Sequence, residues 1–188
     1  TISPYLVRNY LVFEKSTVTK SFGYNLWKGN NTVSTVEGSE SNLAFETDQI
    51  KQKINNLEKN NLYEFNYDKI FLDTSLNYIV ENKLLFIKRY IKKFLTFTLL
   101  NFNSNYPNYY HPANIVPLIF LSIFFMISLI YIYKKKKSFY LNYLLLNLII
   151  TVGVFSIFFI LPRYKLVIIP LQLIIINFWL QKYFKKGV

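Results

Sequence analysis

Long apolar stretches dominate the C-terminal part of the chain. Residues 114–133 and 139–161 contain no charged side chain over 20 and 23 positions. A bilayer core about 30 Å thick needs about 20 helical residues to cross it, and in lipid the backbone must be hydrogen-bonded within the segment. A third stretch, 165–181, is shorter, begins with Lys165 and contains Pro170. The pattern predicts an all-α integral membrane protein with three C-terminal transmembrane helices.

Lysines next to these stretches predict how the protein is oriented. An unbroken run, 134–137, separates the first two spans, and Lys182, Lys185 and Lys186 follow the third, whereas residues 94–113 contain no Lys or Arg. The excess of positive charge lies on the cytoplasmic side of a membrane. We therefore expect a multi-pass protein of the cytoplasmic (inner) membrane, with a cytoplasmic C-terminus. A role in solubility alone does not explain the asymmetry.

The first 113 residues are then extracytoplasmic, and residues 114–188 form the membrane domain. Proline suits a first helical turn, so Pro4 favours a helix at the start. Residues 15–42 are polar and rich in turn-forming residues, which predicts a loop, and the spacing of apolar residues predicts a surface helix over 42–60. Residues 101–112 are expected to form a loop.

A further helix is predicted from about Ser75 to Leu100. At 100° per residue, its basic residues fall on one face and its apolar residues on the other, which is typical of an interfacial helix. The basic face either is solvated above the headgroups or contacts a bound phosphate. The basic residues are Lys88, Arg89, Lys92 and Lys93, and the opposite face has Phe86, Ile87, Tyr90, Ile91, Phe94, Phe97 and Thr98.

Composition narrows the classes of function. The net charge of +12 would suit a nucleic-acid-binding protein, but about half of the cations flank the spans, so an anionic membrane surface or a lipid phosphate is the better partner. There is no cysteine and one histidine, His111, so no metal site and no cofactor are expected. All ten acidic residues lie between Glu14 and Glu81. The spans thus lack the carboxylate that proton-coupled transport needs.

The chain shows no signal sequence or span before its extracytoplasmic region, so something upstream must carry this region across the membrane. We expect the C-terminal piece of a larger polytopic protein, whose N-terminal half would be a partner. A cleaved signal peptide is the alternative.

Two motifs add a family resemblance. Pro4–Tyr10 reads PYLVRNY and Gly23–Asn31 reads GYNLWKGNN; the basic helix and the dipeptide Arg163-Tyr164 follow in order. Together they resemble the second half of bacterial lipid-dependent glycosyltransferases of the GT-C fold, the group of protein O-mannosyltransferases and the lipid A aminoarabinose transferase. The resemblance covers most of the chain, but only the Gly23–Asn31 motif is moderately specific.

The resemblance implies transfer of a sugar from a polyprenyl-phosphate donor to an extracytoplasmic acceptor, with inversion. The family's catalytic Asp lies near the N-terminus of the full protein and outside this chain, so no catalytic residue is assigned and the fragment alone should be inactive. Residues of this half would line the cavity and hold the donor phosphate. The candidates are Arg8, Asn9, Tyr10, Tyr24, Asn25, Trp27, Asn30, Lys92, Lys93, Arg163 and Tyr164.

The arginines support this choice weakly. The chain has 19 Lys but only three Arg, at positions 8, 89 and 163, and the planar guanidinium binds phosphate with two parallel hydrogen bonds. A rival hypothesis is a non-catalytic membrane scaffold or assembly subunit with an extracytoplasmic partner-binding region. A polysaccharide flippase or ligase would need more spans and charged residues inside them.

Overall fold

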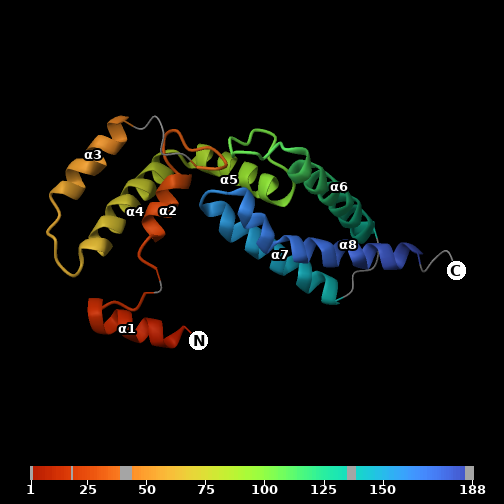
Figure 1. Ribbon diagram of the computed structural model, residues 1–188, viewed down its shortest axis with the longest axis horizontal. Helices are drawn as coiled ribbons and strands as arrows, with labels where there is room; N and C mark the ends of the chain where they lie inside the picture. The colour runs from red at the N-terminus through yellow and green to blue at the C-terminus, as the bar shows by residue number, and fades with distance from the viewer. Residues whose placement is uncertain (1, 18, 39–43, 135–138, 185–188) are drawn as a thin grey trace. The chain divides into compact units, whose positions relative to one another are not determined.

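The computed structural model describes residues 2–17, 19–38, 44–134 and 139–184, and every regular element in these ranges is helical (Figure 1). The chain folds as two compact units, 1–88 and 89–188. In chain order the elements are α1 (Ser3–Phe13), α2 (Phe22–Gly29), α3 (Ala44–Asn55), α4 (Tyr63–Glu81), α5 (Lys83–Thr98), α6 (Pro112–Lys134), α7 (Phe139–Ile157), the 3₁₀ helix η1 (Pro162–Val167) and α8 (Ile169–Phe184). The all-α class predicted from the sequence is confirmed for these residues.

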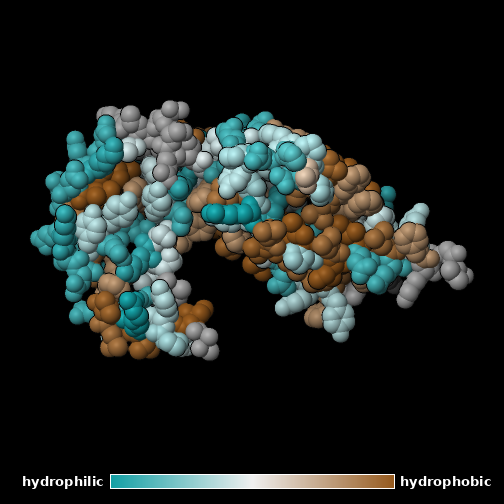
Figure 2. Space-filling view, in the orientation of Figure 1, coloured by the Kyte–Doolittle hydropathy of each residue, from teal (hydrophilic) through white to brown (hydrophobic). Residues whose placement is uncertain are grey.

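Helices α6 and α7 are long and apolar enough to cross a membrane. They have 23 and 19 residues, and only 22% of the most apolar window of each is buried. Most of their side chains therefore face outward, unlike those of the mostly buried core helix of a soluble protein. Figure 2 shows a largely hydrophobic surface over this part of the chain. These features support association with a membrane.

The third predicted span differs from the structure at its start. The stretch 165–181 begins in η1, and helix α8 starts only at Ile169, leaving a shorter apolar helix, Ile169–Gln181. Before η1, Leu161 is held extended by the following Pro162, at ψ 149°, so α7 and η1 cannot form one continuous helix. Helix α7 ends at Ile157 and not at residue 161, so it is shorter than the predicted span. Only α6 and α7 meet the length and composition of a membrane span among the described residues.

The first unit is organised by the contact between α2 and α4. The prediction of a loop over 15–42 is wrong for Phe22–Gly29, which forms α2. Trp27 of α2 and Phe71 of α4 are 3% and 4% exposed, with ring centroids 5.1 Å apart, and Ile50 of α3 completes the core cluster. Helix α3 lies within the predicted range 42–60, of which residues 42–43 are outside the described residues.

Local geometry shows why this short helix docks so closely. A side chain at Gly23 would place its Cβ 2.2 Å from the backbone oxygen of Asp68 and 2.8 Å from Cβ of Leu72. The carboxylate of Asp68 accepts hydrogen bonds from the backbone N–H of Gly23 and of Tyr24, at 2.8 and 2.9 Å. These N–H groups lie at the start of α2 and have no partner within the helix, so Asp68 caps it from another element.

The predicted helix from Ser75 to Leu100 is two helices. Helix α4 begins at Tyr63 and ends at Glu81, Asn82 leaves the helical conformation at φ −118° and ψ 45°, and α5 begins at Lys83. The Asn82 side-chain amide donates to the carbonyl of Tyr78 at 3.1 Å and so satisfies the end of α4. An asparagine side chain can hydrogen-bond to nearby backbone groups and so favours the end of a helix over its interior.

In the second unit, α8 packs against both α6 and α7. Several apolar side chains of this unit are completely buried. These side chains, each with 0% exposure, are Phe97, Phe125, Val152, Ile168 and Ile175. The loop predicted over 101–112 is confirmed up to Pro112, which starts α6.

Candidate functional site

The two units differ completely in charge. Residues 1–88 contain ten basic and ten acidic side chains, while residues 89–188 contain twelve basic and no acidic side chains, which accounts for the net +12 of the chain. Cations in the second unit therefore have no carboxylate within it. Within this unit the partners available to them are carbonyl oxygens, aromatic rings, solvent or an anionic ligand. The lysines at 135–137, 185 and 186 and the side chain of Lys182 lie outside the described residues.

The turn between α7 and α8 carries the most exposed guanidinium of the second unit. Arg163 is exposed on η1, with its guanidinium carbon 5.6 Å from the ring centroid of Tyr164. Tyr164 in turn packs against the rings of Phe155 and Phe159, with centroids 5.6 and 6.1 Å apart. A cation over an aromatic face is held electrostatically. The turn thus presents Arg163 outward on an aromatic base.

Two lysines fix this turn to the end of α5. Nζ of Lys93, from α5, donates to the carbonyl of Phe158, just after α7. Nζ of Lys165, from η1, donates to the carbonyl of Leu99, just after α5. The last carbonyls of a helix lack partners within it and carry partial negative charge, so a lysine is a favourable cap there. Each helix end is therefore capped by a lysine from the other segment.

Three uncharged side chains also donate hydrogen bonds to backbone carbonyls in this region. Nε2 of Gln172, on α8, donates to the carbonyl of Thr98 at 2.7 Å, and Oγ of Ser122, on α6, donates to that of Leu99 at 3.1 Å. The hydroxyl of Tyr90 donates to the carbonyl of Gly153 on α7 at 3.2 Å. Donors from α6, α8 and η1 thus meet the end of α5. We call Lys93, Lys165, Gln172, Ser122 and Tyr90 with their carbonyl partners the capping network.

Burial changes the ionisation of both lysines. Burial, and then the nearby charge of Arg89, lower the pKa of Lys93 from 10.5 to about 7. Burial lowers the pKa of Lys165 from 10.5 to about 8. Removing an ammonium group from water disfavours its charged form. A lysine that has lost its proton can still donate an N–H to the carbonyl.

The single basic face predicted for this helix does not exist. Lys93 is 1% exposed and faces inward, Arg89 is half-buried, and Lys88 and Lys92 are exposed. The predicted apolar face is also divided, because Ile87 and Ile91 are exposed while Phe97 is completely buried. Lys93, which we expected to face water or a phosphate, instead caps the end of α7. Of the two candidates Lys92 and Lys93, only Lys92 is exposed.

The predicted residues of the PYLVRNY segment lie on α1. Arg8 is exposed, and its Nη1 donates to Oδ1 of Asn9 at 3.3 Å. Asn9 is 2% exposed, and its Nδ2 donates to the carbonyl of Thr17 at 2.6 Å, which ties α1 to the segment that follows. Tyr10 is 58% exposed. Arg8 and Tyr10 are therefore accessible, while Asn9 is structural.

The predicted residues of the Gly23–Asn31 motif largely hold α2 in place. Tyr24 stacks on Trp27, and Nδ2 of Asn25 lies 3.4 Å from Oγ of Ser21. Nδ2 of buried Asn30 donates to the carbonyl of Leu26 at 2.9 Å and so caps the end of α2. The indole N–H of Trp27 is buried and has no hydrogen-bond partner within the described part of the chain. The motif thus encodes a docked helix with both of its ends capped.

The structure places the eleven candidates in two groups. Arg8 to Asn30 belong to the first unit, and Lys92, Lys93, Arg163 and Tyr164 to the second. Within the second unit, Lys93 and Arg163 are linked through the turn that Lys93 caps. Sequence reasoning missed Lys165 and Gln172, although polar side chains inside an apolar stretch mark functional or structural positions.

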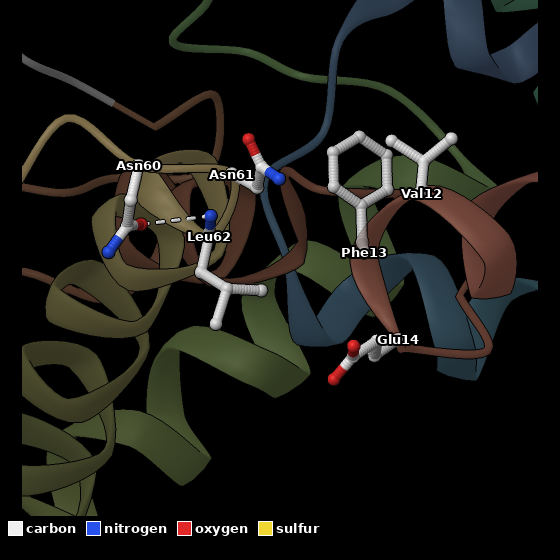
Figure 3. Close-up of a pocket in the computed structure, with 6 residues that line it drawn as sticks. All are labelled: Val12, Phe13, Glu14, Asn60, Asn61 and Leu62. Carbon is white, nitrogen blue, oxygen red and sulfur yellow. Dashed lines mark hydrogen bonds between the residues drawn. The ribbon is translucent and has the colours of Figure 1, made fainter.

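A hollow in the first unit is not lined by any of the candidate residues. It has a volume of about 410 Å³ and lies between the end of α1 and the segment before α4 (Figure 3). The Leu62 N–H donates to Oδ1 of Asn60 at 2.9 Å, the hydrogen bond drawn as a dashed line in Figure 3. Its lining is Val12, Phe13, Glu14, Asn60, Asn61 and Leu62, with Glu14 the one acidic residue and none of the eleven candidates.

No cluster of three or more His, Cys, Asp or Glu that could hold a metal ion exists in the described ranges. Comparisons with protein-family models, with curated proteins and with solved structures found no match.

Proposed function

We propose that the chain is the C-terminal part of a GT-C fold membrane glycosyltransferase, which moves a sugar from a polyprenyl-phosphate donor to an extracytoplasmic acceptor. The two sequence motifs and the apolar helices α6 and α7 support this assignment. The observation that carries it is Arg163, an exposed guanidinium on a turn that Lys93 and Lys165 anchor to α5. No carboxylate of the second unit can neutralise it.

The proposed role of Arg163 is to hold the donor phosphate. When the bond between the sugar and the phosphate breaks, the phosphate leaves with additional negative charge. A guanidinium fixed in advance stabilises that charge through two parallel hydrogen bonds and costs little reorganisation during the reaction. Arg8, the other exposed arginine, is the second candidate for donor binding. In the proposed full-length enzyme, the general base would come from the N-terminal half.

Kinetics of the full-length enzyme test this role. Arg163→Gln should lower kcat/KM for the lipid-linked donor by about 10²-fold, the range seen when a single donor to transition-state charge is removed. Arg163→Lys should recover only part of the loss, because an ammonium lacks the planar fork. Lys51→Gln, at an exposed position of α3, is the matched control for loss of one positive charge. Unchanged kinetics after substitution of Arg8 and of Arg163 would remove the role.

The proposal includes the topology of the membrane domain. Residues 1–113 would be extracytoplasmic, and α8 would form a third crossing, because its 16 residues reach about 24 Å and local thinning of the bilayer accommodates a short span. The C-terminus would then lie in the cytoplasm. Alkaline phosphatase fused after residue 60 should be active, and the same enzyme fused at residue 136 or at the C-terminus should be inactive. Equal activity at residues 60 and 136 would contradict this topology.

A further inference from the structure

Helix α5 has an exposed apolar stripe that its packing leaves uncovered. Leu84 is 85% exposed, Ile87 is 51% exposed, and Ile91 and Leu95 are each 53% exposed. With 3.6 residues per turn, these four side chains fall within an arc of roughly 80° on one side of the helix. We call Leu84, Ile87, Ile91 and Leu95 the outer stripe.

The opposite side of α5 is already used. Lys93, Thr96 and Phe97 are 1%, 8% and 0% exposed, and the hydroxyl of Tyr90 donates to the carbonyl of Gly153. The capping network fixes the end of the helix on this inner side, so α5 cannot turn to bury the outer stripe without breaking these hydrogen bonds. The helix is therefore apolar on two sides, and the side that carries the outer stripe is exposed in the described part of the chain.

Positive charge borders the outer stripe. Lys88 and Lys92 are both exposed and lie one turn apart along one edge of the stripe. Long lysine side chains place their methylene groups on an apolar surface while the ammonium reaches a polar layer. From Arg89 onward the chain has no acidic residue that could compete for these ammonium groups. Apolar side chains edged by lysines match a surface whose interior is hydrocarbon and whose outer layer is anionic.

We propose that the outer stripe docks into the headgroup layer of an anionic phospholipid leaflet, with Lys88 and Lys92 on lipid phosphates. Two features of the chain select lipid as the occupant. Helices α6 and α7 belong to the same chain and are suited to a bilayer, and the exposed ammonium groups of Lys88 and Lys92 favour anionic over zwitterionic lipid. This inference is independent of the sugar-transfer reaction, and its test does not involve Arg163.

Site-specific fluorescence in vesicles tests the docking. The chain contains no cysteine, so each single-cysteine variant carries one label without further engineering. Leu84→Cys, Ile91→Cys and Leu95→Cys would be labelled with a polarity-sensitive fluorophore, and the full chain reconstituted into phosphatidylcholine vesicles with or without about a third of phosphatidylglycerol. Lys51→Cys on α3 is the exposed control. The readout is quenching by nitroxide groups on lipid acyl chains against quenching by aqueous iodide.

The expected result has two parts. Labels on the outer stripe should be quenched by the lipid nitroxide and protected from iodide, while the Lys51→Cys label should show the reverse. Quenching by lipid should increase with phosphatidylglycerol, and Lys88→Gln with Lys92→Gln should remove this increase, since each lysine near an anionic surface changes its affinity about fivefold.

Three results would overturn the proposal. Iodide quenching of the stripe labels as strong as at Lys51→Cys would mean that the stripe faces water. Protection from both quenchers would mean that protein covers the stripe. Lipid quenching that is equal in both vesicles, with or without the two lysines, would exclude recognition of anionic headgroups.

Discussion

Replacing Lys93 by methionine should remove much of the pH dependence of this protein's stability. Burial lowers the pKa of Lys93 from 10.5 to about 7 in the folded chain. Between these two pH values the unfolded state binds a proton that the folded state does not, so the free energy of unfolding rises with pH. Methionine retains the apolar stem of the side chain but cannot titrate.

The magnitude follows from the two pKa values. Each unit of pH across this window changes the free energy of unfolding by about 1.4 kcal/mol for each proton, so Lys93 should contribute about 2 to 3 kcal/mol between about pH 6 and pH 9. Lys165, whose pKa is lowered from 10.5 to about 8, should contribute about 1 kcal/mol over the same range. Methionine at position 93 should leave only the smaller contribution. It also leaves the Phe158 carbonyl without the Lys93 donor, which costs about 1 to 3 kcal/mol at every pH.

The measurement is reversible unfolding of the full chain in a detergent whose headgroup does not titrate, followed by circular dichroism from about pH 6 to pH 9. The control is Lys92→Met, which changes the adjacent and exposed lysine and should leave the slope with pH intact. If the native chain and Lys93→Met show the same slope, the ammonium of Lys93 is not desolvated and the account of the capping network is wrong.

Three further changes test the packing described above. Gly23→Ala should destabilise the first unit by about 3 kcal/mol or more, seen as early loss of tryptophan fluorescence on denaturation, because its Cβ would meet the backbone of Asp68. Gly153→Ala should cost less, because its Cβ would lie 3.2 Å from the Tyr90 hydroxyl and would meet no backbone atom. Asp68→Asn should cost about 1 kcal/mol in the same assay, because it removes the negative charge at the start of α2, and an unchanged midpoint would contradict this role. Gln172→Leu should cost about 1 to 3 kcal/mol in thermal unfolding, because the Thr98 carbonyl loses this donor, and a more stable variant would show that the amide is dispensable.

The parts of the fold that depend on local composition were predictable. The uncharged runs identify α6 and α7 because a helix in lipid needs about 20 apolar residues, and Pro4 marks the first turn of α1. Neither inference needs a residue far away in the chain. The all-helical class and the membrane character of the C-terminal part follow from such local signals.

Elements fixed by distant residues could not be predicted in this way. Glycine and asparagine favour turns, so Phe22–Gly29 reads as a loop, yet it is a helix because Asp68, 45 positions after Gly23, caps its start and Trp27 packs on Phe71. The inward direction of Lys93 is hidden for the same reason. Its acceptor, the Phe158 carbonyl, lies 65 residues away in the sequence. Every residue has a backbone carbonyl, so the order of side chains does not reveal which carbonyl accepts a hydrogen bond.

The exchange of lysines between α5 and the α7–α8 turn has a consequence for how the membrane part is assembled. The carbonyls at the end of α5 receive donors 66 and 74 residues further along the chain, and the Phe158 carbonyl receives its lysine from a helix made long before it. The carbonyls at the end of α5 and after α7 therefore gain these hydrogen-bond donors only when the two segments pack together. Biogenesis of this region should therefore proceed as one concerted event after the last helix has left the ribosome, and a chain truncated before Lys165 should be an early target for proteolysis.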